Sequence, residues 1–476
     1  MNKHRLFTLA LLCLSTGGFT ALARSGEDTK QALTAAFLQY LQQQETALQT
    51  GNDQFMANAG ARIVLPARLK ADKALSGKQV VRQQQMVWEA WQEANRQLKE
   101  EKLIPLDSLC TTHQGAWHLP GSLEPNATLP YYYGSKKAEG SPLPLFLYVH
   151  GSGPKDHEWS NGIALARYFD DAPCLYFIPQ IPNEGEYYRW WQKAKQYAWE
   201  KLLRLTLASS QADADRLYVF GISEGGYGSQ RLASFYADYW AAAGPMAGGE
   251  PLMNAPAENC ANIGFSLLTG AEDDGFYRNQ LTGYVKEAFD SLQHLCPQAF
   301  RHRIELIPHR QHHIDYSPTT PWLKTFTRNP YPRRVMWEDY DMDGRHRSGF
   351  YNLQVLQRPQ EKVEARTRYD MQIDSATNTV RLSVSDVTYE TVERDTLWGI
   401  ALRFARHYTP STRGRLRIYL NSSLVDLSRP VSVLVNGKEM YRGKVQSTLT
   451  SMAESCAEYF DPRRIYPACI DVTIQK

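Results

Sequence analysis

The stretch from Leu217 to Gly226 constrains the fold of this 476-residue chain more than any other. Its first four residues, Leu217 to Phe220, are apolar or aromatic, which is typical of a strand buried on both faces. The glycines that follow permit a tight turn, and the next segment has apolar residues at helical spacing. We therefore predict a strand, a sharp turn and a helix, with Ser223 held in the turn.

Ser223 stands at the centre of a Gly-x-Ser-x-Gly sequence. In a strained strand-to-helix turn of this kind the serine hydroxyl is exposed above the sheet, while the glycines let strand and helix pack closely. The five-residue pattern alone also arises by chance, so the predicted strand before it and the predicted helix after it carry the interpretation. Ser223 is therefore the candidate nucleophile.

Strand-like and helix-like segments alternate on both sides of this turn. The strand runs lie at residues 143–149, 175–178, 217–220, 263–268 and 304–307, and the helical stretches at 163–169, 190–207, 227–240 and 284–294. Strands that alternate with helices need crossover connections. The pattern therefore predicts an α/β domain with a mostly parallel sheet covered by helices on both faces.

The two ends of the chain have a different texture. Residues 24–106 are rich in Gln, Ala, Leu, Glu and Lys, and they predict a segment with two amphipathic helices. Residues 329–476 contain short alternating runs separated by turns, with the hairpin turn Asn436-Gly437 as the clearest of them. They predict an all-β, sandwich-like domain. The α/β domain then occupies residues 107–328.

The first residues predict a secretory signal peptide. Met1 to Ala23 has a basic start, an apolar run and small residues before an expected cleavage after Ala23. No later segment offers about 18 uninterrupted apolar residues, so we expect no membrane span and a secreted or periplasmic protein. Removing residues 1–23 lowers the formal net charge from +3 to +1, which gives no electrostatic case for binding nucleic acid.

Six cysteines remain after this cleavage. An even number in an exported chain is typical of disulfides. We expect Cys260 to pair with Cys296, and Cys456 with Cys469, because the members of each pair are close in the sequence. Buried thiols are the alternative.

Two later strand runs are each followed by side chains that could activate Ser223. A serine hydroxyl needs a base, and the base needs an acid that holds its tautomer and stabilises its cation. Asp273 and Asp274 follow the fourth strand run, and His312 and His313 follow the fifth. We predict Asp273 as the acid and His312 as the base. Asp274 and His313 are the alternatives.

A tetrahedral intermediate would also need backbone donors for its oxyanion. We nominate the amide of Glu224, directly after the nucleophile, and those of Gly151 and Ser152 in the small-residue loop after the first strand run. This chemistry requires no cofactor. The histidines around His312 have no second cluster of metal ligands, so we also predict no metal.

The stretch from about 143 to 322 resembles the α/β-hydrolase superfamily, and within it secreted esterases of the dienelactone-hydrolase and polyhydroxybutyrate-depolymerase type. The residues that carry the resemblance are His150-Gly-Ser-Gly, Asp215 to Gly226, Ala247-Gly248, Gly270-Ala-Glu-Asp273 with Arg278-Asn279, and His312-His-Ile-Asp-Tyr316. In such relatives the acid follows the turn glycine by three residues. The resemblance therefore implies a Ser–His–Asp hydrolase and favours Asp273 over Asp274.

We expect an exported serine hydrolase that cleaves carboxylic esters through an acyl-enzyme, acting on small-molecule esters or on acyl groups of polysaccharides. Two other functions stay open. A serine peptidase of the same fold would use the same triad on amides, and a catalytically silent protein would bind polysaccharide through the β-rich domain. The sequence does not specify the oligomeric state.

Overall fold

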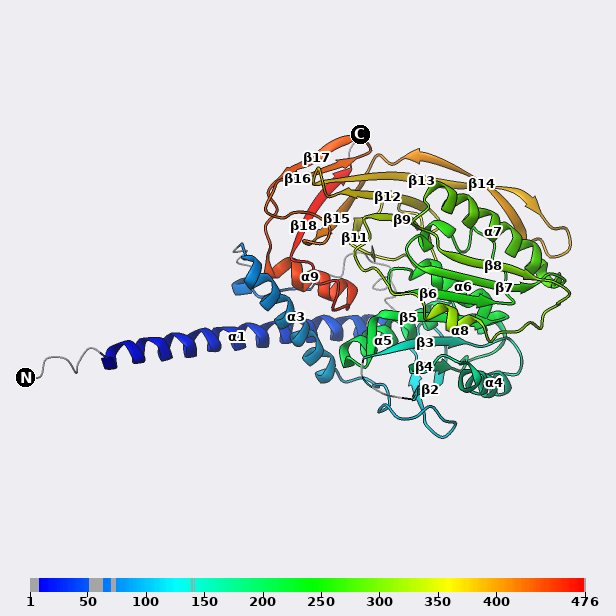
Figure 1. The fold of residues 1–476 in the computed structure, drawn as a ribbon, viewed down its shortest axis with the longest axis horizontal. Coiled ribbons are helices and arrows are strands. Elements are labelled where there is room, and N and C mark those ends of the chain that lie inside the picture. The colour runs from blue at the N-terminus through cyan, green and yellow to red at the C-terminus, as the bar shows by residue number, and fades with distance from the viewer. Residues whose placement is uncertain (1–7, 51–62, 70–73, 138–139, 141, 475–476) are drawn as a thin grey trace, which may run out of the picture.

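The computed structural model describes residues 8–50, 63–69, 74–137, 140 and 142–474, with side chains from residue 26 onward. At its centre is an eight-stranded sheet in the order β1-β2-β4-β3-β5-β6-β7-β8 (Figure 1). The six strands β4, β3, β5, β6, β7 and β8 run parallel to one another, whereas β2 is antiparallel to both of its neighbours. The strands are β1 (Gln114–His118), β2 (Thr128–Lys136), β3 (Leu143–Val149), β4 (Cys174–Pro179), β5 (Ala212–Ile222), β6 (Ala242–Met246), β7 (Gly264–Gly270) and β8 (His302–Ile307).

Helices cover both faces of this sheet. They are α4 (Lys155–Tyr168), α5 (Lys193–Ser209), α6 (Glu224–Phe235), α7 (Arg278–Leu295) and α8 (Thr319–Leu323). Successive residues of a strand point to opposite faces, so Leu145 and Leu147 of β3 pack with α5, α6 and α7, while Phe146 and Tyr148 pack with α4 and α8. This is the α/β-hydrolase arrangement, and the predicted fold class is confirmed.

Strand β6 is the one strand of this parallel set that the apolar runs did not predict. Its sequence, Ala-Ala-Gly-Pro-Met, has no run of large apolar residues, yet all five residues are buried between β5 and β7. Position inside the sheet, rather than side-chain hydrophobicity, makes this segment a strand.

The C-terminal part forms two further sheets. One has the order β10-β11-β15-β18, and the other has the order β17-β16-β13-β12-β9 with β14 paired to β13. The strands are β9 (Arg334–Asp339), β10 (Gly349–Phe350), β11 (Leu353–Gln357), β12 (Arg366–Asp374), β13 (Thr379–Arg394), β14 (Ala401–Pro410), β15 (Gly414–Leu420), β16 (Val431–Val435), β17 (Lys438–Gly443) and β18 (Ala468–Ile474). The predicted turn Asn436-Gly437 joins β16 to β17, and both of its residues have positive φ, 48° and 81°.

The C-terminal part is not all-β, because it contains helix α9 (Leu449–Tyr459). Met452 and Cys456 on this helix are buried in one cluster with the N-terminal helices α1 (Thr8–Gln49) and α3 (Gly77–Gln97). In the same cluster the rings of Phe37 and Trp91 meet edge to face with centroids 5.1 Å apart. Helix α9 therefore packs against the N-terminal helices, a contact that strand periodicity could not predict. The three-residue 3₁₀ helix η1 (Ala67–Leu69) lies between α1 and α3 in the chain.

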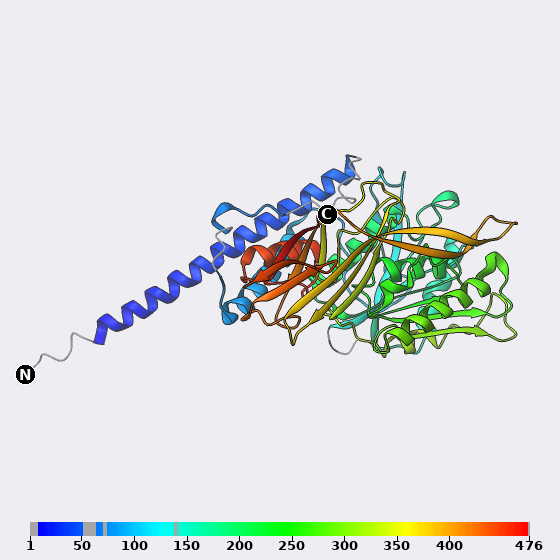
Figure 2. The same cartoon turned by 90° about the horizontal axis from the view of Figure 1, so that it is seen from above.

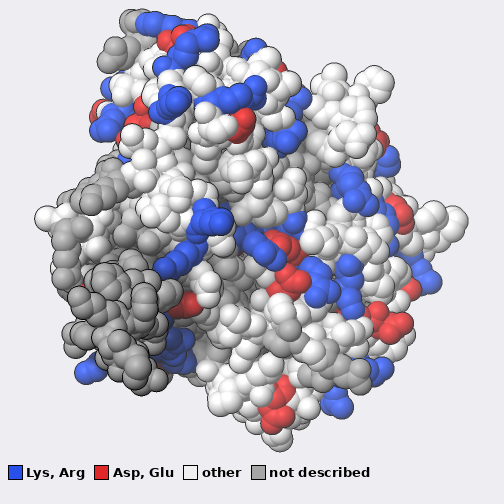
Figure 3. Space-filling view, turned by 60° about the vertical axis from the view of Figure 1, so that its left-hand side comes forward, with Lys and Arg blue, Asp and Glu red and all other residues white. Residues whose placement is uncertain are grey.

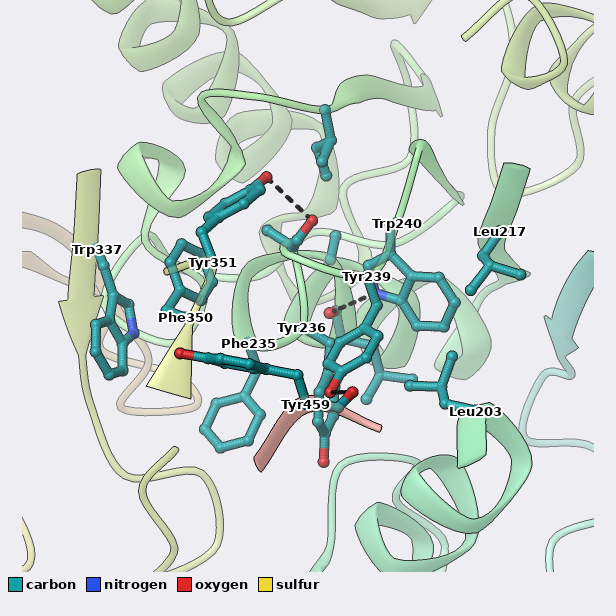
Figure 4. Close-up of a cluster of buried hydrophobic side chains, with 14 of the residues drawn as sticks. Leu203, Leu217, Phe235, Tyr236, Tyr239, Trp240, Trp337, Phe350, Tyr351 and Tyr459 are labelled. Carbon is teal, nitrogen blue, oxygen red and sulfur yellow. Dashed lines mark hydrogen bonds between the residues drawn. The ribbon is translucent and has the colours of Figure 1, made fainter. Parts of the chain in front are cut away.

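The hydrophobic core runs without interruption from the α/β sheet into the C-terminal sheets (Figure 4). Trp337 of β9 and Phe350 of β10 stack with centroids 5.3 Å apart, on the side of Phe235 at the end of α6. The hydroxyl of Tyr239 donates a hydrogen bond to the carbonyl of Tyr459 in α9, at 2.9 Å. The domain boundaries stay predictions, and the two parts share one packed interior.

All six cysteines from Cys110 onward are free thiols, so the disulfides predicted from sequence proximity are not present. Cys456 faces the cluster of N-terminal helices, whereas Cys469 packs against the core of the sheets. Cys296 instead contacts the guanidinium of Arg334, which lies 3.0 Å from its sulfur. Closeness in sequence was misleading because the members of the 456–469 pair belong to different packed layers.

The predicted signal peptide lies only partly within the described residues. Residues 1–7 are outside them, and α1 begins at Thr8 and continues through the expected cleavage position to Gln49. Among the helices that the structure describes, none has the length and apolar character needed to cross a bilayer. On the face shown in Figure 3, basic and acidic side chains are intermixed.

Candidate active site

Ser223 lies in the turn between β5 and α6 in a strained conformation, with φ 57° and ψ −116°. Because glycine has no Cβ atom, the glycines of this turn can lie very close to the backbones of the adjacent strands. A Cβ atom on Gly225 would lie 1.9 Å from the carbonyl oxygen of Val149, and one on Gly226 would lie 2.3 Å from that of Met246. No larger residue fits at either position, so the glycines of the motif allow the turn to sit between β3 and β6.

The side chains of Ser223, His312 and Asp273 form a continuous chain of hydrogen bonds. Ser223 Oγ lies 3.0 Å from His312 Nε2, and His312 Nδ1 lies 2.8 Å from Asp273 Oδ2. Since an ionised carboxylate only accepts hydrogen bonds, Nδ1 carries the proton and Nε2 is free to accept that of the serine. His313 and Asp274 lie outside this chain: the ring of His313 is 6.1 Å from that of His312, and Asp274 is exposed.

Backbone contacts between two loops bring the acid and the base together. The amide of Glu272 donates to the carbonyl of Arg310 at 2.9 Å. A Cβ atom on Gly270, at the end of β7, would lie 2.0 Å from the carbonyl oxygen of Gln311. The loop after β8 can therefore cross close enough to β7 for His312 to reach Asp273 only because residue 270 is glycine.

Arg278, the first residue of α7, binds the same carboxylate as His312. Its Nε lies 2.9 Å from both oxygens of Asp273, and its second terminal nitrogen lies 2.6 Å from Oδ1. Burial acts to raise the pKa of Asp273, but the hydrogen bonds from Arg278 and His312 outweigh it and hold the pKa below its ordinary value. The carboxylate is therefore ionised and fixed in orientation.

The small-residue loop after β3 is oriented by two buried side chains. Tyr188 Oη donates to the carbonyl oxygen of Gly151 at 2.7 Å, and His150 Nδ1 lies 2.7 Å from the same oxygen. His150 Nε2 accepts the amide of Ile181 at 3.1 Å, so the proton of this imidazole is on Nδ1. Burial lowers the pKa of His150 to about 4, which keeps the ring neutral.

This arrangement determines which way the Gly151–Ser152 peptide points. The carbonyl and N–H of a trans peptide face opposite directions, and the carbonyl of Gly151 faces Tyr188. The N–H of Ser152 therefore points away from Tyr188, and Ser152 lines the pocket that contains Ser223. Glu224 begins α6 directly after Ser223, so its amide is one of the free donors of a helix N-terminus. Both are suited to hold an oxyanion.

The pocket around Ser223 has a volume of about 260 Å³ and mixed polarity. Arg189, Trp191 and Tyr227 line it together with the carboxylate of Glu224. Burial raises the pKa of Glu224 to about 7, and the opposing effect of Arg189 is partial because its guanidinium lies 3.7 Å away. Oε1 of Glu224 is buried without a hydrogen-bond partner.

Among the described residues, no three His, Cys, Asp or Glu side chains are grouped so that they could hold a metal ion.

No protein-family model matches the chain. A feruloyl esterase B from Thermothelomyces thermophilus is 26% identical over 173 residues, which cover 33% of this chain and 58% of that protein. The chain thus matches little more than half the length of this curated relative. Among solved structures, a thermostable esterase is 20% identical with a TM-score of 0.32, over 44% of this chain and 59% of its own. A poly(3-hydroxybutyrate) depolymerase from Bordetella parapertussis is 15% identical with a TM-score of 0.32, over 42% and 85%.

Two residues of this site were not identified as functional by local sequence patterns. Arg278 acts on the site only through contacts that the fold creates, and Ile400 reaches the pocket from the C-terminal sheets. Arg278 was visible only as part of the family resemblance. No local pattern could have identified Ile400, because it is more than 170 residues from Ser223 in the chain.

Proposed function

We propose that this α/β-hydrolase-fold protein is an exported serine hydrolase that cleaves carboxylic esters, including acyl groups on saccharides. The observation that carries the proposal is the hydrogen-bond chain from Ser223 through His312 to Asp273, whose serine lines a pocket. The 26% identity to a feruloyl esterase supports an ester rather than an amide as the substrate.

In the proposed reaction, Ser223 Oγ bonds to the carbonyl carbon of the ester while its proton passes to His312 Nε2. The carbonyl electrons move to oxygen, and the amides of Glu224 and Ser152 donate to the resulting anion. Asp273 stays ionised and stabilises the imidazolium. The intermediate expels the alcohol, which takes the proton from His312, and leaves an acyl group on Ser223.

A water molecule then repeats these steps. It transfers a proton to His312 as its oxygen attacks the acyl carbon, and Ser223 leaves with that proton. The products are a carboxylic acid and an alcohol, and the enzyme returns to its starting state. No cofactor takes part in this proposal.

Labelling with a fluorophosphonate probe tests the nucleophile. We expect one probe per molecule, mapped by peptide mass spectrometry to Ser223, and no label on the Ser223→Ala variant. A folded wild-type protein that takes up no probe would contradict the proposal and favour a polysaccharide-binding protein without activity.

Substrate pairs test the bond that is cleaved. We expect methyl ferulate or 4-nitrophenyl acetate to be hydrolysed at least about 100-fold faster, by kcat/KM, than amides of the same acids, because amides have poorer leaving groups. Comparable rates on amides would favour the serine peptidase.

The export part of the proposal rests on the sequence of residues 1–23. N-terminal sequencing of the protein recovered from outside the cytoplasm should give Arg24 as the first residue. Recovery of the full-length chain only from the cytoplasm would contradict export.

A further inference from the structure

A long hairpin extends from the C-terminal sheets (Figure 2), and its tip borders the catalytic pocket. It consists of β13 and β14, and Ile400 near its tip lines the pocket together with Ser223. Glu393 on the hairpin accepts hydrogen bonds from Gln280 at 2.9 Å and from Tyr284 at 2.7 Å, both on α7. The hairpin is thus attached to α7, which begins directly after the loop that carries Asp273 (residues 271–277, here called the acid loop).

The tip of this hairpin exposes large apolar side chains beside an aromatic residue of the acid loop. Leu397 is 74% exposed, Trp398 is 59% exposed and Phe276 of the acid loop is 50% exposed. The rings of Phe276 and Trp398 have centroids 5.2 Å apart. Asp395 accepts the amides of Leu397 and Trp398 at 2.8 and 2.6 Å. The hydrogen bonds to Asp395 therefore hold these side chains in place at the surface, and apolar side chains gathered in this way are common at binding surfaces.

The backbone beneath Phe276 is strained. Phe276 and Tyr277 both have left-handed conformations, with φ 53° and 61°. Aromatic residues rarely adopt this conformation, and such strain concentrates at functional sites. Its effect here is to place Phe276 where it lines both the catalytic pocket and the neighbouring cleft.

We call this neighbouring depression the hairpin cleft. It has a volume of about 780 Å³, three times that of the catalytic pocket, and it is lined by Asp274, Phe276, Gln280, Leu397 and Trp398, among others. The cleft therefore combines exposed aromatic faces with a carboxylate and an amide. Its volume lies in the range of about 300–1,000 Å³ that is typical of ligand sites.

We propose that the hairpin cleft binds a saccharide unit on the alcohol side of the ester. A pyranose ring has a flat C–H face that can pack on Trp398 or Phe276, and its hydroxyls need acceptors such as the carboxylate of Asp274. A hydrocarbon chain would offer that carboxylate no hydroxyl to bind. The inference rests on the proposed esterase function and adds the alcohol that the enzyme recognises.

Two esters of one acid separate this proposal from general catalysis. Feruloylated xylobiose carries the saccharide, and methyl ferulate lacks it, while the bond that breaks is the same. We expect Trp398→Ala to lower kcat/KM for the xylobiose ester about tenfold more than for methyl ferulate, since it loses an aromatic contact surface. The matched control is Val392→Ala, which changes another exposed apolar residue of the same hairpin, 59% exposed, and should leave the ratio of the two rates unchanged.

A binding measurement separates weaker saccharide binding from other causes of a lower turnover rate. In the Ser223→Ala background, calorimetry should show feruloylated xylobiose binding about tenfold more weakly when Trp398→Ala is added. An unchanged rate ratio together with unchanged binding would overturn the saccharide site. If the wild-type protein cleaves neither ester and takes up no fluorophosphonate, the esterase function fails instead, while calorimetry still decides whether the cleft binds saccharide.

Discussion

Two clusters in this protein pair aspartates with arginines, and they use the pairing in different ways. In the candidate active site, Arg278 contacts both oxygens of Asp273, and Oδ2 also lies 2.8 Å from His312 Nδ1. At the junction between α6 and the C-terminal part, both oxygens of Asp238 accept hydrogen bonds from arginines, with Arg347 at 3.0 and 3.1 Å. Arginine contacts both oxygens of each carboxylate, but Asp273 also has a histidine on Oδ2, whereas Asp238 has only arginine side chains on its two oxygens.

The pKa values of the two clusters do not distinguish them. Burial acts to raise the pKa of Asp461 in the junction, but Arg328 and Arg464 outweigh it and lower the pKa to about 2. The pKa of Asp273 is also lowered. What differs is the geometry. In the junction, Arg328 and Arg464 reach carboxylates distant in the chain, whereas Asp273 is bound by an arginine five residues away and also by His312. A depressed carboxyl pKa therefore indicates ion pairing and needs the hydrogen-bond pattern to indicate catalysis.

The largest effect should come from His312, the proposed base, which distinguishes the Asp273 cluster from the junction. We expect His312→Ala to lower kcat/KM for 4-nitrophenyl acetate by at least about 10⁴-fold, because Ser223 loses its proton acceptor. His313→Ala is the matched control and should retain nearly full activity, with circular dichroism showing both variants folded. Full activity in His312→Ala would remove the proposed catalytic role of the cluster.

Removing Asp238 from the junction should lower the free energy of unfolding of the protein. Asp238→Ala leaves Arg347 buried without its carboxylate and Arg464 with Asp461 alone, and we expect the free energy of unfolding to fall by about 3–5 kcal/mol. Urea denaturation measures the change. Asp426→Ala removes an exposed ion pair with Arg429 and should leave the urea midpoint unchanged. A similar midpoint for all three proteins would mean that the junction does not stabilise the fold.

Glu224 represents a third case, a buried carboxylate whose arginine is too far away for a hydrogen bond. Its pKa is raised from 4.5 to about 7, so the folded protein binds more protons than the unfolded chain between these values. The contribution of Glu224 to stability is thus full below pH 4.5 and is lost as pH rises to about 7. We expect Glu224→Gln to stabilise the protein by up to about 3 kcal/mol at pH 8, at about 1.4 kcal/mol per pKa unit.

The comparison with low pH is the control for this variant. At pH 4 the wild-type carboxyl is protonated, and thermal unfolding of Glu224→Gln and wild type should coincide. An equal gain in stability at both pH values would mean that the variant acts through packing, and that the ionised form of Glu224 does not destabilise the fold.

The smallest effect should come from Arg278, which orients the acid without touching the reacting atoms. We expect Arg278→Met to lower kcat/KM about tenfold, and Arg278→Lys to restore part of the loss. Losing Arg278 also removes the largest effect that lowers the pKa of Asp273, so the acid should protonate at higher pH and the acidic limb of the pH–rate profile should move to higher pH. An unchanged profile with lower activity would indicate a structural role only.

The sequence by itself determined the class of the central fold. Apolar runs at β3, β4, β5, β7 and β8, separated by helical stretches, require a parallel sheet whatever the rest of the chain does. The glycines around Ser223 and the order of the acidic and histidine-containing loops follow from the same local patterns. These features are readable because they depend on residues that are neighbours in the chain.

The tertiary structure alone decided how side chains from separate loops meet. Which of two adjacent aspartates, and which of two adjacent histidines, joins Ser223 depends on the crossing of the loop after β8 over Gly270. Burial between two strands makes β6 a strand, separate packed layers keep Cys456 from Cys469, and a hairpin from the C-terminal sheets borders the pocket. Each of these outcomes depends on contacts between residues far apart in the chain, for which a linear pattern has no signal.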